Sequence, residues 1–233
     1  MPFQDRTAML IGEDGVRLLE KKHVAVFGLG GVGGYVAEAL ARGGLGALTL
    51  FDGDRVTESN RNRQLIALCS NEGKNKAEEM ASRILDIHPG CHVTAHPVFY
   101  TAQNAPAYPF GAFDYVVDAV DMVSAKIEII VRAKEAGVPV ISSMGAGNKL
   151  HPECFEIADL EETEVCPLAR ILRKEMRKRR VRGVKVVYSR EAPLRPAVLH
   201  DGDGRLPGSV SFVPGAAGLV LAGAVIRDLL GLS

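Results

Sequence analysis

The sequence predicts an α/β fold in which a doubly wound, mainly parallel, Rossmann-like sheet is extended by antiparallel strands in the C-terminal part. Short apolar, β-branched runs alternate with helix-like runs from residue 23 to residue 142. A glycine turn of the form G-x-G-x-x-G separates the first such run from the helix after it. Further strand-like runs at 154–158 and 184–188 follow once this alternation has ended, so we expect them to extend the same sheet.

Length and composition fit one soluble domain. The chain has 233 residues, of which 47% are hydrophobic and 24% charged, and its formal net charge is zero. We therefore treat 1–233 as a single domain with a nucleotide-binding half, 1–145, and a substrate-binding half, 146–233. The first residues lack a signal-peptide pattern, and the apolar run 215–226 is shorter than the roughly 20 residues that cross a bilayer. We expect no membrane span and a cytoplasmic protein.

The first βαβ unit contains the glycine turn. We expect a short helix at 12–20, a strand at 23–27, a helix at 35–42 and a strand at 47–51. Gly28 permits a tight exit from the strand, Gly30 lets backbone N–H groups approach an anion, and Gly33 lets the helix lie close to the sheet. Asp52 follows Gly33 by 19 residues, near the spacing at which an acid meets a ribose hydroxyl. The turn predicts a nucleotide site, the alternative being a tight turn without a ligand.

The next elements continue the alternation. A polar, cationic segment at 58–64 begins a helix that includes Leu65 and Leu68, and a longer helix opens at 73–76 and is stopped by Pro89. Strands are expected at 91–99, at 113–120 and at 138–142, with a helix at 127–136 between the last two. The carboxyl ends of parallel strands meet at one edge of the sheet, where ligands bind. Asp52, Asp121 and Ser142 all stand at such ends.

The pattern changes after Gly145. Besides the strands at 154–158 and 184–188, we expect a basic helix at 168–178 and a strand at 208–212 that leads into a helix at 215–230. The segment 191–207 is rich in proline and glycine and predicts an irregular loop. The four cysteines form no C-x-x-C pair, which argues against a zinc site of that kind.

The predicted fold places three cations, an amide and a carboxylate around the glycine turn. The residues are Asn60, Arg61, Arg63, Lys76 and Asp121. Several cations neutralise phosphate oxygens and an acid at a strand end can hold Mg²⁺, so the set suits a nucleoside triphosphate. An NAD oxidoreductase needs little beyond the fingerprint and one acid, and is disfavoured. Arg63 or Lys76 taken singly can also be an ordinary solvated charge at a helix end.

Six ordered motifs carry a family resemblance. They are Arg6-Thr-x-x-Leu-Ile-Gly12, Gly28-x-Gly30-Gly31-Val-Gly33, Asp52-x-Asp54, Ser59-Asn60-x-x-Arg63-Gln64, Gly73-x-x-Lys76 and Asp118-Ala-Val-Asp121. This set, which covers residues 6 to about 145, resembles the ThiF/MoeB/HesA superfamily of ubiquitin-activating-like adenylating enzymes.

The resemblance implies ATP-dependent adenylation of a carboxylate, with ATP and Mg²⁺ as cofactors. By motif position, Asp52 binds the ribose, Asn60, Arg63 and Lys76 bind the phosphates, and Asp121 binds the metal. Arg6 reaches the ATP site of a partner subunit, which implies a homodimer. The implied nucleotide-binding set is Gly28, Gly30, Gly31, Gly33, Asp52, Asp54, Ser59 and Asn60, and the implied catalytic set is Arg63, Lys76, Asp121 and Arg6.

The second half indicates the branch. Members that activate carrier proteins commonly have C-x-x-C zinc pairs, which this chain lacks. Its motifs at 142–148, 167–170, 187–193 and 208–214 resemble instead the tRNA threonylcarbamoyladenosine dehydratase branch. The implied reaction activates the threonylcarbamoyl carboxylate on the adenosine beside the anticodon, which then closes a ring with net loss of water. Whether ATP ends as AMP or ADP stays open.

Two other functions stay open, and the resemblance implies one further partner. The first alternative is adenylation of the C-terminus of a ubiquitin-like or sulfur-carrier protein. The second is a nucleotide-binding regulator that does no chemistry. The resemblance also implies a sulfur-transfer system, made of a cysteine desulfurase and a sulfur acceptor, as a partner.

A basic run follows an acidic stretch in the second half. Residues 151–165 carry six acids and no lysine or arginine, whereas 170–185 carries nine bases and one acid. With a tRNA substrate implied, the run is suited to contact phosphates of an anticodon stem. The alternative is a solvated helix that pairs with the acidic stretch. The candidate tRNA-binding residues are Arg170, Arg173, Lys174, Arg177, Lys178 and Arg180.

Cys166 departs from the branch pattern, which tends to have Asp before Pro-Leu-Ala. A thiol near Arg170 and Arg173 can act as a nucleophile. The alternative is a buried or incidental thiol, which we favour because the dehydration needs no thioester.

Overall fold

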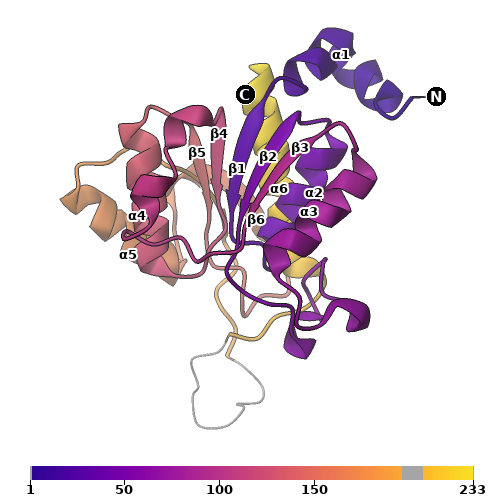
Figure 1. The fold of residues 1–233 in the computed structure, drawn as a ribbon. Coiled ribbons are helices and arrows are strands. Elements are labelled where there is room, and N and C mark those ends of the chain that lie inside the picture. The colour runs from indigo at the N-terminus through magenta and orange to yellow at the C-terminus, as the bar shows by residue number, and fades with distance from the viewer. Residues whose placement is uncertain (1, 196–206, 233) are drawn as a thin grey trace.

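The computed structural model describes residues 2–195 and 207–232 of the chain, and a seven-stranded sheet runs through it (Figure 1). The strand order is β3-β2-β1-β4-β5-β7-β6. Every neighbouring pair is parallel except β6 and β7. The strands are β1 (His23–Phe27), β2 (Ala47–Phe51), β3 (His92–His96), β4 (Tyr115–Asp118), β5 (Val140–Ser143), β6 (Phe155–Asp159) and β7 (Lys185–Ser189). The predicted fold class is confirmed, and its antiparallel part is β6 alone, because β7 still runs parallel to β5.

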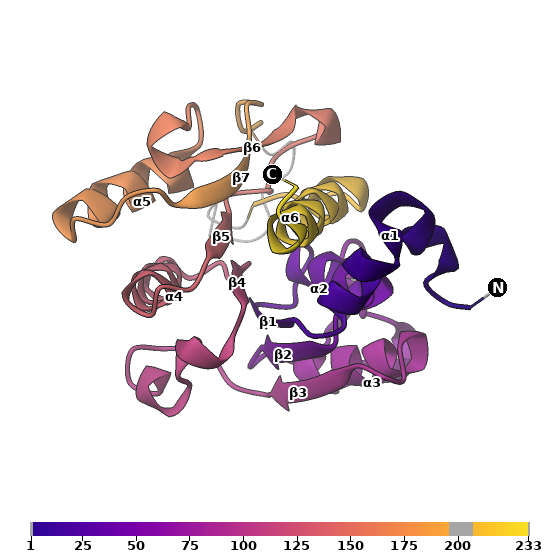
Figure 2. The ribbon, with the colours of Figure 1, turned by 90° about the horizontal axis from the view of Figure 1, so that it is seen from above.

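Helices cover both faces of the sheet (Figure 2). One face carries α2 (Gly33–Arg42), α3 (Lys76–Ile87) and α6 (Phe212–Leu230), and the other carries α4 (Val123–Glu135) and α5 (Pro167–Lys178). The first helix, α1 (Asp5–Leu19), lies against α6. Strands that are buried on both faces need apolar side chains on both, which explains why β1 and β2 are nearly continuous apolar runs.

The side chains of β1 divide between two cores. Val24 and Val26 belong to the core beneath α2 and α6, whereas Ala25 and Phe27 belong to the core that includes α4. Successive side chains of a strand point to opposite faces, so one short strand anchors both layers. The loops that leave the carboxyl ends of β1, β2, β4 and β5 are therefore held on a rigid frame.

The predicted helix after residue 58 is wrong. Residues 58–71 form two 3₁₀ turns, Glu58–Asn60 and Cys69–Asn71, joined by non-helical backbone. The Asn60 side chain accepts the Thr57 N–H at 3.2 Å, and the Asn71 side chain accepts the Leu68 N–H at 2.9 Å. Asparagine side chains that bond nearby backbone in this way compete with a helix and favour turns.

The N-terminal helix is longer than predicted. It begins at Asp5 rather than at residue 12, so residues 6–11 are helical as well. Gly12 has φ 74° and ψ 163°, which interrupts the helix without ending the element. Glycine adopts this conformation at no steric cost, and here it kinks α1.

The C-terminal segment also differs from the prediction. Residues 207–210 form no strand, and α6 already begins at Phe212, with Pro214 in its first turn where no N–H is needed. The predicted irregular loop at 191–207 is described only for 191–195 and 207, which have no helix or strand, and the rest lies outside the described residues. At 19 residues, α6 has the length and apolar composition of a membrane span, whereas the apolar run 215–226 alone was expected to be too short. Half of the apolar window in α6 is buried inside the fold.

A close approach of two helices fixes α6 on α2. A Cβ built on Gly218 lies 2.5 Å from the Val32 carbonyl oxygen and 2.8 Å from the Tyr35 Cβ. On Gly223, in the same helix, the nearest atom is the flexible end of Arg227 at 3.5 Å. An alanine methyl group would therefore clash with α2 and the turn before it at position 218, but would meet only a flexible side chain at position 223.

We predict that Gly218→Ala lowers the free energy of unfolding by about 1–3 kcal/mol, because the methyl group pushes α6 away from α2. Gly223→Ala is the matched control and leaves stability unchanged or raises it by up to about 1 kcal/mol, because alanine favours a helix interior. Urea unfolding of the two variants measures both values, and equal effects would contradict the packing described.

Candidate active site

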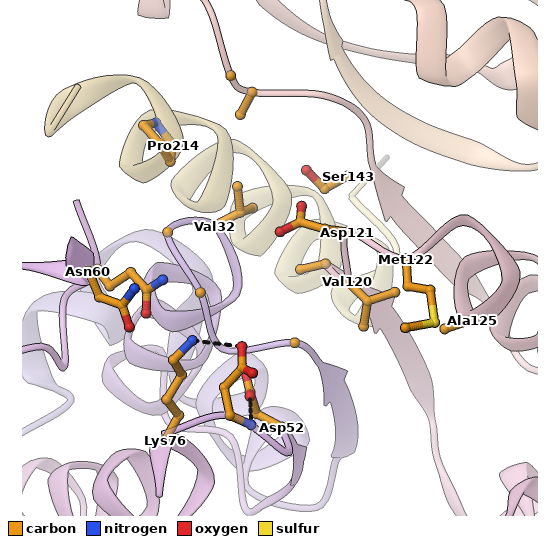
Figure 3. Close-up of a pocket in the computed structure, with 18 of the residues that line it drawn as sticks. Val32, Asp52, Asn60, Lys76, Val120, Asp121, Met122, Ala125, Ser143 and Pro214 are labelled. Carbon is orange, nitrogen blue, oxygen red and sulfur yellow. Dashed lines mark hydrogen bonds and ion pairs between the residues drawn. The ribbon is translucent and has the colours of Figure 1, made fainter. Parts of the chain in front are cut away.

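A cavity of about 500 Å³ lies at the edge of the sheet where the parallel strands end (Figure 3). Its walls come from the glycine turn after β1, from the segments that follow β2, β3, β4 and β5, and from residues 207–209 with the start of α6. Ser142, expected at this edge, is fully buried behind the wall, and the next residue, Ser143, lines the cavity instead. The crevice predicted at the carboxyl ends of the strands is present.

The glycine turn is sterically required. Gly28 has φ 84°, and a Cβ there would lie 2.7 Å from the Ala119 carbonyl oxygen. A Cβ on Gly33 would lie 1.8 Å from the Gly28 carbonyl oxygen, which no side chain can tolerate. Gly28, Gly30 and Gly31 line the cavity, whereas Gly33 lies behind them and serves the packing of α2.

Asp52 supports the turn from the neighbouring strand. Its carboxylate accepts the Leu29 N–H at 2.7 Å and the Asp54 N–H at 2.8 Å, and the residue is only 9% exposed. Burial raises the pKa of the Asp52 carboxyl, against the two backbone donors and Lys76, which lower it. Asp52 therefore both lines the cavity and fixes the backbone that surrounds it, a second role that the spacing alone does not predict.

Lys76 faces the cavity from the first position of α3. Asn75 caps that helix, since its side chain accepts the Ala77 N–H at 2.9 Å. The Lys76 Nζ lies 3.0 Å from an Asp54 carboxylate oxygen, and the residue is only 4% exposed. A lysine buried to this degree is not an ordinary solvated helix-end charge, so that alternative is wrong for Lys76.

The segment before Gln64 contributes two further residues. The half-buried Arg63 guanidinium lines the cavity and donates to the Ser59 carbonyl oxygen at 3.0 Å, and Asn60 lines it at 9% exposure. Ser59 itself is exposed and does not line the cavity. Arg61 also stays outside, where it pairs with Glu58. The structure thus brings Asn60, Arg63 and Lys76 together and leaves Ser59 and Arg61 out.

Asp121 stands on another wall of the cavity, near Ser143, while Lys76 and Asn60 approach from the far side (Figure 3). It is exposed to solvent. In 2–195 and 207–232, no three histidine, cysteine or acidic side chains form a metal-binding group. Mg²⁺ usually takes one or two carboxylates and completes its shell with phosphate oxygens and water. A single carboxylate in a cavity that Lys76 and Arg63 also line fits that chemistry.

Two buried polar atoms of residues that line the cavity have no partner among the residues that the structure describes. Gln64 Oε1 and Tyr100 Oη are buried and have no hydrogen-bond partner within the described part of the chain. Burial raises the pKa of the Tyr100 hydroxyl, which stays neutral and able to donate. Unpaired buried polar groups are costly unless a ligand or water satisfies them, so the wall fits a polar ligand. Gln64 stands in a motif, whereas no sequence pattern singles out Tyr100.

The candidate tRNA-binding residues lie mostly along α5. Leu168, in its first turn, lines the cavity, and one shallow groove beyond it is lined by Arg170, Arg173, Lys174, Arg177 and Lys178. Arg173 donates to Thr163, and Glu175 of the same helix pairs with Lys178 and Arg179. No residue of the acidic stretch forms an ion pair with this run in the part of the chain described. The alternative of a helix neutralised by that stretch is therefore not supported.

Arg6 and Cys166 lie away from the cavity. Arg6 is exposed on α1, at the end of the sheet opposite the loops that form the cavity (Figure 1). Gln4 fixes that position, because its side chain donates to the Arg42 carbonyl oxygen at the end of α2, 3.1 Å away. Cys166 is 4% exposed and does not line the cavity, as expected for a buried thiol.

Comparison with known proteins gives a family and close relatives. Residues 4–233 match the ThiF family. The chain is 41% identical over 238 residues to a tRNA threonylcarbamoyladenosine dehydratase of Bacillus subtilis, across 97% of this chain and 93% of that protein. It superposes on Escherichia coli TcdA in complex with ATP with a TM-score of 0.89 at 35% identity, covering 97% of this chain and 93% of the other. The same enzyme in complex with AMP gives the same TM-score at 36% identity.

A relative with a different activity matches a smaller part. The adenylyltransferase and sulfurtransferase MOCS3 of Drosophila grimshawi is 33% identical over 131 residues, which cover 56% of this chain and 29% of that protein. The similarity to the dehydratase thus covers 97% of this chain, a larger share than the 56% that is similar to MOCS3.

Proposed function

We propose that this chain, which belongs to the ThiF family, is an ATP-dependent tRNA threonylcarbamoyladenosine dehydratase. The observation that carries the proposal is the match along nearly the whole length of a dehydratase, 97% of this chain and 93% of the relative. The family resemblance predicted from the six motifs is confirmed. Because a tRNA is the substrate, we place the enzyme in the cytoplasm, and we keep the sulfur-transfer system as a proposed partner.

The reaction overcomes a poor leaving group. A carboxylate is unreactive toward acyl transfer because oxide would have to leave. One oxygen of the threonylcarbamoyl carboxylate attacks the α-phosphorus of ATP, a carboxyl oxygen–phosphorus bond forms, and the bond to the bridging oxygen breaks to release pyrophosphate. The carbamoyl group of the same nucleoside then attacks the activated carbonyl carbon and loses its N–H proton. The carbon–oxygen bond to the phosphate breaks, so the ring closes and AMP leaves with that oxygen. The first attack brings anions together, so cations must neutralise charge in its transition state.

The cavity residues take distinct roles in this proposal. Lys76, Arg63 and Asn60 hold the phosphates, because they converge on the cavity from two segments beside the glycine turn. The Asp52 carboxylate meets the ribose while it holds the turn through its two backbone contacts. Asp121 holds Mg²⁺, which when bound supplies positive charge to the phosphate oxygens.

The tRNA contacts follow from the course of α5. Its first turn reaches the cavity through Leu168, and its basic groove continues along the same helix. An adenosine placed in the cavity therefore has its neighbouring phosphates beside α5. Base stacking has no aromatic side chain in this run, so these contacts hold the backbone and carry no sequence information.

We extend the proposal to a homodimer in which Arg6 serves the partner's cavity. Within one chain, α1 lies at the end of the sheet opposite the loops whose residues line the cavity (Figure 1). Near Arg6, Met9 is 72% and Leu10 is 89% exposed, and large apolar side chains exposed together favour a protein contact. A two-fold dimer would bury both copies of this surface at once.

The proposed reaction is tested directly with purified protein, ATP and tRNA that carries threonylcarbamoyladenosine. We expect the nucleoside to lose one water, as measured by mass spectrometry after gentle digestion, and we expect no conversion without ATP. Cells that lack the protein should accumulate the open nucleoside. Unchanged tRNA together with ATP consumption that depends on a carrier protein would favour the carrier-adenylating alternative.

Mixing two inactive variants tests Arg6 and Lys76 together. Arg6→Ala and Lys76→Met are each expected to lose most of their activity, because each lacks a cation at the phosphates. If Arg6 acts on the partner's cavity, mixed dimers contain one intact site, and an equimolar mixture after subunit exchange recovers about a quarter of the wild-type rate. No recovery, with mixed dimers verified by mass, would show that Arg6 does not act across the interface.

Charge removal on α5 tests the tRNA surface. Replacing Arg170, Lys174 and Arg177 together by glutamine should weaken tRNA binding and reduce the slope of log affinity against log salt by about two to three. Arg170→Lys, Lys174→Arg and Arg177→Lys combined form the matched control, because they keep the charge and should keep the slope. ATP affinity should stay the same in both proteins, and an unchanged slope in the glutamine variant would rule this surface out.

A further inference from the structure

A buried ion pair lies directly behind the wall of the cavity. Lys126 of α4 is 1% exposed and Asp118, the last residue of β4, is 0% exposed, and the Nζ lies 3.0 Å from a carboxylate oxygen. The Ser142 hydroxyl donates to the same oxygen at 2.5 Å. The end of β5 is therefore hydrogen-bonded to the ion pair as well. Neither charged residue lines the cavity.

The pair holds one residue of the cavity wall, Val120, at both its N–H and its carbonyl group. The Lys126 Nζ donates to the Val120 carbonyl oxygen at 2.9 Å, and the Val120 N–H donates to the other Asp118 oxygen at 3.2 Å. The next residue in the chain is Asp121, whose side chain stands at the cavity (Figure 3). The backbone that carries Asp121 is thus fixed by an ammonium and a carboxylate that point away from the ligand space.

Packing alone does not explain this arrangement. Removing two charges from water is costly, and a buried ion pair is often no more stabilising than apolar side chains of the same volume. An apolar pair would fill the space but could not bond the Val120 carbonyl oxygen. What the charges supply is therefore a fixed position for the segment after β4.

We propose that Lys126 is a positioning residue, whose ammonium holds the Val120 carbonyl and thereby aims Asp121 at the metal–phosphate group. The proposal rests on the proposed function, in which Asp121 holds Mg²⁺. Residues that orient a metal ligand typically change metal affinity or activity about 10- to 100-fold when they are replaced. Lys126 therefore acts on Mg²⁺-dependent binding and leaves the phosphate contacts of Lys76 and Arg63 in place.

The test measures ATP affinity with and without Mg²⁺ by calorimetry. For Lys126→Met we expect unchanged affinity for ATP alone and an Mg²⁺ concentration for half-maximal effect that rises about 10- to 100-fold. Lys126→Arg can still donate to both acceptors and should stay within a few-fold of wild type. Lys134→Met is the matched control, because Lys134 is a lysine of the same helix that donates to a backbone carbonyl, that of Gly183, away from the cavity.

A second variant covers the case in which the first does not fold. Asp118→Asn combined with Lys126→Met leaves no buried charge unpaired, and its amide oxygen can still accept from Ser142 or Val120. We expect the same Mg²⁺ defect from it, with a melting temperature recorded for every variant. A wild-type Mg²⁺ dependence in the folded variants overturns the proposal, as does an equal loss of affinity with and without the metal.

Asp121→Asn separates the two levels of inference. If this variant loses the Mg²⁺ effect while Lys126→Met keeps it, the positioning role fails and the proposed function stands. If Asp121→Asn keeps the Mg²⁺ effect, the proposed metal role of Asp121 fails, and the role of Lys126 fails with it.

Discussion

The contact between the glycine turn after β1 and the segment after β4 is the constraint on which the site depends. The strand order reverses between these two strands, so the helices that follow them, α2 and α4, leave on opposite faces and open a crevice. Gly28 meets the Ala119 carbonyl so closely that no side chain fits between them. That contact places the glycine turn and Asp121 in the walls of one cavity.

Charge is arranged around this cavity before any ligand arrives. Lys76 is buried and paired with Asp54, and Asp52 holds the turn through two backbone N–H groups. Behind the opposite wall, Lys126 and Asp118 hold the segment that carries Asp121. Preorganised groups need little rearrangement when charge develops during reaction, which suits the attack of one anion on another. Polar groups on opposite walls of the cavity are thus each held by their own hydrogen bonds and ion pairs.

The first half of the fold was predictable because its signals are local. Apolar periodicity and the turn Gly28–Gly33 locate β1, α2 and β2 within a few residues. The turns at 58–71 were missed because asparagine side chains, and not periodicity, decide them. The motifs identified Lys76 and Asp121, but not the ion pair between Lys126 and Asp118, because these two residues meet only through the packing of α4 against β4. Tyr100 was missed for the same reason, since only the folded cavity shows that its hydroxyl is buried without a partner among the described residues.

The central claim is that the substrate carboxylate attacks the α-phosphorus of ATP in this cavity. The most direct measurement uses tRNA whose threonylcarbamoyl carboxylate carries a heavy-oxygen isotope, followed by mass spectrometry of the nucleotide products after one turnover. Adenylation requires one labelled oxygen to leave with AMP when the ring closes. Label found in orthophosphate, with ADP as the product, would show attack at the γ-phosphorus and would contradict the mechanism.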